Sequence, residues 1–184
     1  MNRLLRVQAY NNAWANHRLG AACSLLSNNE LTKERDGFFG TIIATLNHIL
    51  IVDWFYVSAM EGQCMGLSAF DDRIPCPDMV SLVEEQRKID RRFISTCLQV
   101  KDDGATRSVE LIRGDNVQIE RFDRTFLHLI QHQIHHRGQV HCMLSGTSVA
   151  PPQLDEFYLA WEPDQKLREP DLEAMGMSET LIWG

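Results

Sequence analysis

The sequence has little of what marks a secreted, disulfide-bonded protein. Its five cysteines are widely spaced, none of them forms a C-x-x-C pair, and their odd number fits no closed disulfide framework. The N-terminal segment MNRLLRVQAYNNAW becomes polar too soon to act as a secretory signal peptide. We therefore expect reduced thiols and a cytoplasmic location.

An excess of positive charge and a membrane-spanning segment are lacking as well. The net charge is -7 at neutral pH, whereas proteins that bind nucleic acids usually carry a basic patch. The most apolar run, residues 38–61, contains Asn47, His48 and Asp53, which favours a buried helix over a membrane span. We expect neither a nucleic-acid partner nor a membrane partner.

What the sequence does contain is the pattern of a helical domain. Its 184 residues, of which 44% are hydrophobic and 23% charged, suit one globular domain. Apolar side chains at helical spacing predict four long helices. We place them at about residues 3–26, 38–61, 79–100 and 124–145. The second of these is apolar on nearly every side, so we expect the other helices to enclose it.

Local signals mark several ends of these elements. Asp78 is expected to open the third helix, and Asp123 to cap the fourth, which Gly146 would end. Between the third and fourth helices, residues 107–121 change to an alternating pattern with Gly-Asp-Asn as turn residues. That change of period predicts a β-hairpin.

Beyond the fourth helix the helical pattern weakens. An amphipathic stretch at about 153–161 precedes a tail that contains Pro163 and Pro170, and we expect this tail to be mostly irregular. The predicted fold class is all-α: a four-helix bundle with a small β-hairpin before the last bundle helix and a C-terminal extension. We expect a single domain over residues 1–184, with the bundle at about 3–146 and the extension at about 147–184.

Histidines are concentrated in the fourth helix, where the stretch HLIQHQIHHRGQVH, residues 128–141, holds five of the chain's seven. Side chains four residues apart on a helix point the same way and lie about 6 Å apart. His132 with His136, or His128 with His132, can therefore hold one metal ion. His128 and His136 are about 12 Å apart along the axis, too far to share an ion. The alternative is a polar helix face that happens to be rich in histidine.

His48 is a third candidate ligand, because it lies in the middle of the most apolar helix. A buried imidazole needs partners for both ring nitrogens, and a metal ion with a supporting acceptor would supply them. A lone, hydrogen-bonded core histidine is the alternative, but the histidine pair on another core helix favours the metal. Three neutral nitrogen ligands suit zinc, nickel or iron(II) and leave coordination positions open, as in catalytic sites.

Three segments resemble the DinB/YfiT-like family. They are the run H-x-x-x-H-x-x-x-H-R-G-Q from His128 to Gln139, the segment TLNHILIVDWF around His48, and PPQLDEF at residues 151–157. The resemblance covers about residues 1–160. It implies a four-helix bundle, commonly a homodimer, with a divalent metal ion on three histidines, here His48, His132 and His136.

The resemblance also implies a choice of activities. Some relatives are thiol S-transferases or isomerases that use a low-molecular-weight thiol, and others are described as metal-dependent hydrolases. A small molecule is therefore the expected substrate. In that setting His128, one turn before the ligand pair, would contact the ligand histidines without binding the metal itself.

Three further polar residues are candidates for supporting roles. Asp53 either orients a ligand histidine or bonds to the first helix. Gln139 contacts a ligand histidine or another helix, and Arg137 is interpreted as a structural anchor rather than a substrate clamp. No nucleophile with its base is evident, so the sequence assigns no catalytic residue.

The leading hypothesis is a metal-dependent enzyme that activates water or a small thiol. The alternative from another class is a stress-linked, dimeric bundle that binds a metal or ligand without turnover. In a third interpretation the histidines are structural and the bundle mainly dimerises. An exchangeable coordination position on the metal would distinguish the first hypothesis from the other two.

Overall fold

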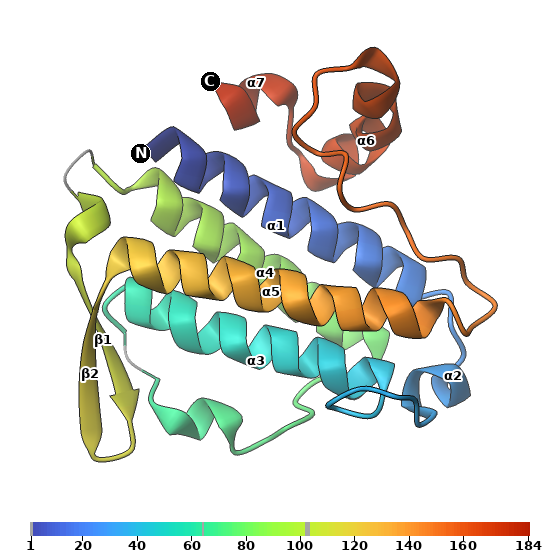
Figure 1. Ribbon diagram of the computed structural model, residues 1–184, viewed down its shortest axis with the longest axis horizontal. Coiled ribbons are helices and arrows are strands. Elements are labelled where there is room, and N and C mark those ends of the chain that lie inside the picture. The colour runs from blue at the N-terminus through green and yellow to red at the C-terminus, as the bar shows by residue number, and fades with distance from the viewer. Residues whose placement is uncertain (1, 64, 102–103) are drawn as a thin grey trace.

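The computed structural model describes residues 2–63, 65–101 and 104–184. Four long helices form a bundle, as predicted (Figure 1). Their bounds are α1 Asn2–Cys23, α3 Ile42–Met60, α4 Met79–Leu98 and α5 Phe122–Leu144. Both α1 and α3 pack against α4 and α5, which gives the bundle a single apolar core.

The central helix of the bundle is α3. By length and apolar composition α3 could cross a membrane. However, 83% of its most apolar 18-residue stretch is buried inside the protein, as expected of an enclosed core helix. It begins at Ile42 rather than at residue 38. Gly40 adopts a positive φ of 72°, and Thr41 is extended and accepts a hydrogen bond from the Ala44 amide, so the helix has its N-cap there.

The predicted hairpin precedes α5. Strands β1 Ser108–Arg113 and β2 Asn116–Arg121 pair antiparallel across a tight turn, in which Gly114 has a φ of 62°. Asp78 caps α4 as predicted, accepting from the Ser81 amide. The cap predicted for α5 is wrong by two positions: Arg121 is the N-cap residue, and Asp123 lies in the first turn, where a carboxylate is favoured by the helix dipole.

The C-terminal extension is helical, which corrects the expectation of an irregular tail. It contains α6 Glu162–Met175 and α7 Glu179–Trp183, which lie against α1 (Figure 1). Pro163 sits in the first turn of α6, where its missing amide proton breaks no helical hydrogen bond, and Pro170 lies inside the helix. A short helix, α2 Asn28–Thr32, was also missed in the polar segment before α3.

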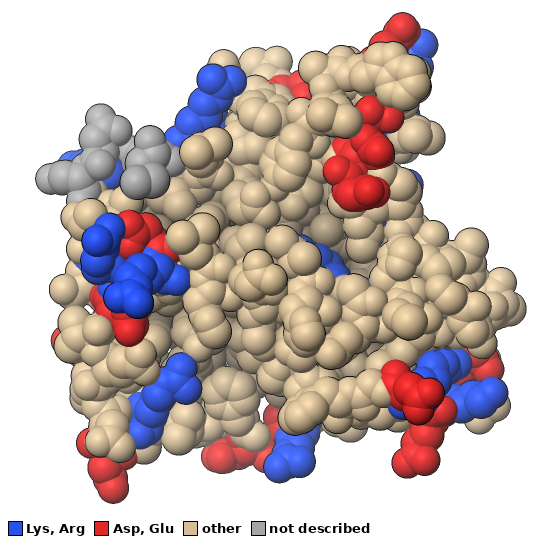
Figure 2. Space-filling view, in the orientation of Figure 1, with Lys and Arg blue, Asp and Glu red and all other residues tan. Residues whose placement is uncertain are grey.

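Charged groups avoid the middle of one face of the molecule. Figure 2 shows acidic and basic side chains mainly around its margins, with a largely uncharged area over α5.

On α4, Lys88 pairs with Glu84 at 2.8 Å and with Glu85 at 2.9 Å. Paired charges of this kind fit a solvated helix face rather than a basic binding patch.

Candidate metal centre

Three histidines meet between α3 and α5. His48 comes from the middle of α3, and His132 and His136 come from successive turns of α5. One ring nitrogen from each lies within 4.8 Å of the corresponding nitrogens of the other two. The Nε2 atoms of His48 and His132 are 3.0 Å apart. The structure therefore brings the predicted trio together and forms a group that could hold a metal ion.

The spacing of the nitrogens fits a shared ion. Two imidazole nitrogens bound to one zinc ion at about 2.0–2.1 Å lie about 3.0–3.4 Å apart, depending on the angle between the bonds. The 3.0 Å separation of the His48 and His132 nitrogens falls in that range. Two lone pairs at this distance repel each other. The two Nε2 atoms therefore need either a shared proton or a cation bound to both.

Electrostatics keep these rings neutral. Burial, with a smaller contribution from His136, lowers the pKa of His48 to about 4. Burial, followed by the neighbouring histidines, lowers the pKa of His132 to about 3. The pKa of His136 is also lowered, mainly by burial. Neutral imidazoles keep a lone pair free for a metal ion at physiological pH.

Two neighbours orient the rings. Nδ1 of His136 lies 2.9 Å from Oε1 of Gln139, so it donates its proton there and leaves Nε2 for a ligand bond. Phe39 stacks on His48 with 4.1 Å between ring centroids and lies 5.4 Å from the His136 ring. Phe39 falls in the range 38–61 predicted as the second helix, but it lies in the turn before α3, and that turn makes it a wall of the site.

Both the sequence and the fold of this chain match those of known proteins. The model of the DinB family matches residues 1–171. The chain belongs to the DinB family. It is 26% identical over 129 residues to the uncharacterized protein YizA of Bacillus subtilis (strain 168), a match that covers 70% of this chain and 79% of YizA. A crystal structure of a DinB-like protein from Bacillus cereus ATCC 10987 shares the fold, with a TM-score of 0.59 and 17% identity over 76% of this chain and 90% of that one.

In this DinB family chain, His128 lies outside the three-histidine group. Its ring centroid is 6.4 Å from that of His132 and 5.1 Å from that of Tyr56. His128 and Tyr56 line a cavity of about 210 Å³ between α3, α5 and the hairpin, and none of the three ligand candidates is among its lining residues. Tyr56 was not singled out from the sequence, because nothing in the local pattern of α3 separates it from core residues.

Asp53 belongs to a different polar group from the histidines. It projects about 140° around α3 from His48, being five residues further on. Its Oδ1 accepts a hydrogen bond of 2.5 Å from Gln133 and its Oδ2 one of 2.7 Å from Gln86. The hydrogen bonds of the Asp53 carboxylate therefore run to α5 and α4, whereas the sequence suggested a bond to a ligand histidine or to the first helix.

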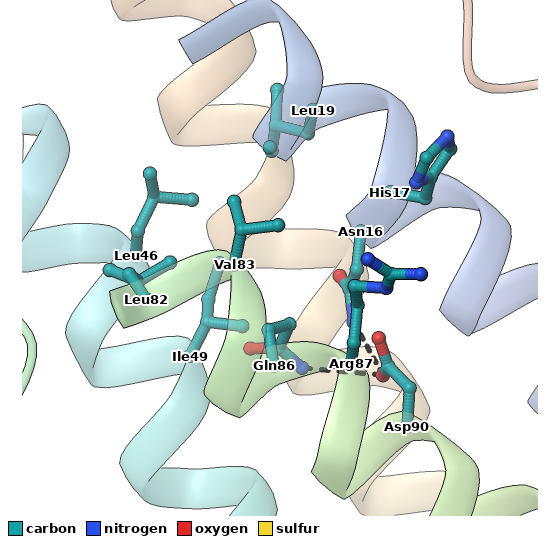
Figure 3. A pocket seen from close by; sticks show the side chains of 11 residues that line it. Asn16, His17, Leu19, Leu46, Ile49, Leu82, Val83, Gln86, Arg87 and Asp90 are labelled. Carbon is teal, nitrogen blue, oxygen red and sulfur yellow. Dashed lines mark hydrogen bonds between the residues drawn. The ribbon is translucent and has the colours of Figure 1, made fainter. Parts of the chain in front are cut away.

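The same network reaches α1 through α4. Gln86 donates to Asp90 at 3.2 Å, and Asn16 donates to Asp90 at 2.9 Å (Figure 3). Nη1 of Arg137 donates to Asn12 at 2.5 Å and to Asn16 at 2.9 Å, so Arg137 is the anchor that the sequence predicted. Burial raises the pKa of Asp90 and lowers the pKa of Arg137 to about 10. The buried Arg137 guanidinium thus favours the charged forms of Asp53 and Asp90 at the centre of the bundle.

Proposed function

We propose that His48, His132 and His136 hold one divalent metal ion per chain, and that the protein is a metal-dependent enzyme of the hydrolase or thiol S-transferase type. The observation that carries this proposal is the 3.0 Å approach of two imidazole nitrogens from different helices, at a group that a third ring completes. Membership of the DinB family is compatible with a metal-binding protein.

The chemistry follows from the number of ligands. Three protein ligands leave positions at which a divalent metal can lower the pKa of a bound water or thiol and present it as a nucleophile. Zinc, nickel and iron(II) all suit three imidazoles. The substrate is a small molecule that approaches the metal past His128, whose ring centroid lies 6.4 Å from that of His132.

The chain's own residues prepare the site. Gln139 fixes the tautomer of His136 through the hydrogen bond to Nδ1. Phe39 covers one face of His48 and excludes water from that side. Among the described residues, Cys23, Cys76 and Cys97 are buried free thiols and Cys142 is an exposed one. None of these four belongs to the three-histidine group, so the reacting thiol in a transfer reaction would be a separate small molecule.

Metal analysis of protein purified without an affinity tag tests the site. We expect about one ion per chain in the parent and loss of that ion in His48→Ala, His132→Ala and His136→Ala. His135→Ala is the matched control, since His135 is an exposed neighbour on α5 outside the three-histidine group. A parent that carries no metal, and takes up none when zinc, nickel or iron is added, would refute the proposal.

Turnover tests the enzyme type. The metal-loaded parent is incubated with 4-nitrophenyl acetate for hydrolysis, and with 1-chloro-2,4-dinitrobenzene plus cysteine for thiol transfer. A rate above background that disappears in His132→Ala identifies which nucleophile the site activates. A saturated metal without turnover would instead support the binding-protein alternative.

We also propose a cytoplasmic homodimer. Leu127 and Ile134 lie seven residues apart, on one face of α5, and their exposed fractions are 64% and 49%. The face drawn in Figure 2 has few charged groups over the middle of α5, and the cores of dimer interfaces are likewise poor in charged residues. Sedimentation equilibrium at about twice the chain mass of 21.1 kDa would support the dimer, and the single-chain mass would refute it.

A further inference from the structure

One guanidinium in the cavity that His128 and Tyr56 line is held in place by neutral groups. Arg113, at the end of β1, donates from Nη2 to the Tyr56 hydroxyl at 3.0 Å and from Nε to Oε1 of Gln118 at 3.1 Å. Its guanidinium carbon lies 5.7 Å from the centroid of the Phe55 ring. These three contacts fix the position of the guanidinium, and none of them neutralises its charge.

This guanidinium lines the same cavity as His128, the neighbour of His132 in the three-histidine group. Arg113, Tyr56 and His128 all line the volume of about 210 Å³. The His128 ring contacts Tyr56 on one side and faces His132 on the other, at centroid distances of 5.1 and 6.4 Å. Tyr56 is eight residues beyond His48 on α3, so the Arg113 end of the cavity lies about 12 Å from the histidine group along the helix axis.

A second basic residue in the cavity is differently placed. Nε of Arg124 lies 3.8 Å from a carboxylate oxygen of Glu120, which also lines the cavity. That carboxylate offsets part of the Arg124 charge, and the Arg124 side chain is 72% exposed to solvent. Arg113 is therefore the better-placed cation for an anionic ligand, because its side chain contacts two neutral oxygens and an aromatic face.

We propose that Arg113 binds an oxyanion, a carboxylate or a phosphate, at one end of the substrate whose other end reacts at the three-histidine group. A planar guanidinium matches both oxyanions with paired hydrogen bonds. The substrate class is thus an elongated anionic small molecule, with about 12 Å between its anionic group and its reacting atom. This inference rests on the proposed metal site, since the histidines supply the reacting end.

The test uses thiols that bind the metal through sulfur at one end and carry a carboxylate, a phosphonate or an alcohol at the other. The full chain is loaded with cobalt(II), and thiolate binding is followed by the cobalt–sulfur charge-transfer absorption. The probes are 8-mercaptooctanoate, 8-mercaptooctylphosphonate and the neutral 8-mercapto-1-octanol. The short pair 3-mercaptopropionate and 3-mercapto-1-propanol cannot reach from the histidines to Arg113.

We expect the parent to bind one of the long anionic thiols about tenfold more tightly than the long alcohol, as a charge-assisted hydrogen bond would give. The carboxylate and phosphonate arms show which oxyanion is preferred. The short pair should show no such preference. Arg113→Gln should abolish the preference of the long pair, and Arg113→Lys should retain part of it. Arg124→Gln is the matched control and should keep most of it.

Two results would overturn the inference and leave the proposed function standing. They are equal affinities for the long anionic and neutral thiols in the parent, and a preference that survives in Arg113→Gln. Failure of every thiol to produce the absorption in cobalt-loaded parent would instead refute an open metal site, and with it this inference. The comparison of chain lengths in the parent does not depend on how any variant folds.

Discussion

Gln133 on α5 donates a hydrogen bond of 2.5 Å to Asp53 on α3, and the same amide nitrogen lies 3.3 Å from the carbonyl oxygen of Ile49. Gln133 follows His132 in the chain, and Ile49 follows His48. The bonds of one fully buried side chain therefore join the two helices directly behind the histidines that approach each other. The distance between the ligand candidates depends on these two hydrogen bonds, here called the Gln133 clamp, as well as on apolar packing.

Replacing Gln133 with alanine tests the clamp. Gln133→Ala leaves Asp53 with one hydrogen bond fewer in a dry interior, so we expect the free energy of unfolding to fall by about 2 kcal/mol. We also expect weaker zinc binding, because α3 and α5 are freer to separate. Urea unfolding and chelator competition measure the two effects. Gln131→Ala, at an exposed position of the same helix, should change neither, and a Gln133→Ala protein with parental zinc affinity would contradict the clamp.

Gln139 offers a test of ligand orientation. Its Oε1 accepts the Nδ1 proton of His136, and loss of such a partner typically weakens metal binding 10- to 100-fold. We expect Gln139→Ala to weaken zinc binding within about that range, measured by competition with a chromogenic chelator. Gln139→Glu keeps an acceptor and should bind zinc like the parent. If the two variants bind zinc equally, the hydrogen bond does not position His136.

Much of the bundle and the histidine group could be predicted from the sequence. Helix geometry alone places His132 and His136 on one face, and the apolar surroundings of His48 indicate a core helix. The contacts of Phe39 and Arg113 could not be predicted in the same way. Each depends on how a turn or hairpin folds back on a distant helix, and no local period carries that information.

The tail shows where local rules failed. Pro163 and Pro170 suggested an irregular segment, yet both lie in α6. Pro163 occupies the first turn, where proline is favoured. Two residues before Pro170, the buried side chain of Arg168 donates hydrogen bonds to the carbonyl oxygens of Glu156 and Leu159, and helix propensity does not reveal such tertiary contacts.

The lowered histidine pKa values predict how the metal-free protein responds to acid. An unfolded chain takes up protons on histidine below about pH 6.5, whereas folded His48 and His132 do so only near pKa values of about 4 and about 3. Their contribution to stability is therefore complete above pH 6.5 and is lost as the pH falls toward 4. Melting temperatures across this window should fall less steeply for His132→Ala than for the parent. Equal slopes would contradict the neutral, partly buried state of His132.

The buried cation makes a separate prediction. Arg137→Met leaves the acidic groups of Asp53 and Asp90 without the charge that faces them, and breaking a buried ionic group costs about 3–5 kcal/mol. We expect a loss of that size in urea unfolding. Adding Asp90→Asn to Arg137→Met should restore part of it, because a neutral amide needs no cation. A double variant as unstable as the single one would show that Arg137 acts through packing alone.

Arg168 provides the last test, at the junction between the extension and the bundle. Its side chain is 2% exposed and donates to the carbonyl oxygens of Glu156 and Leu159 at 3.0 and 2.9 Å and to Glu179 at 2.7 Å. Arg168→Met removes these bonds and leaves two carbonyl groups without their donor, so the segment that ends in α7 should open more often.

We expect trypsin to cleave the Arg168→Met protein faster than the parent at Lys166, while zinc affinity stays unchanged because the three histidines lie in the bundle. Arg124→Met is the matched control, since Arg124 is exposed and distant in sequence from the extension. Cleavage at the parental rate would show that the apolar contacts of Phe157 and Leu172, both buried, suffice to hold the extension. Loss of zinc binding together with faster cleavage would show that the extension and the metal centre are energetically coupled.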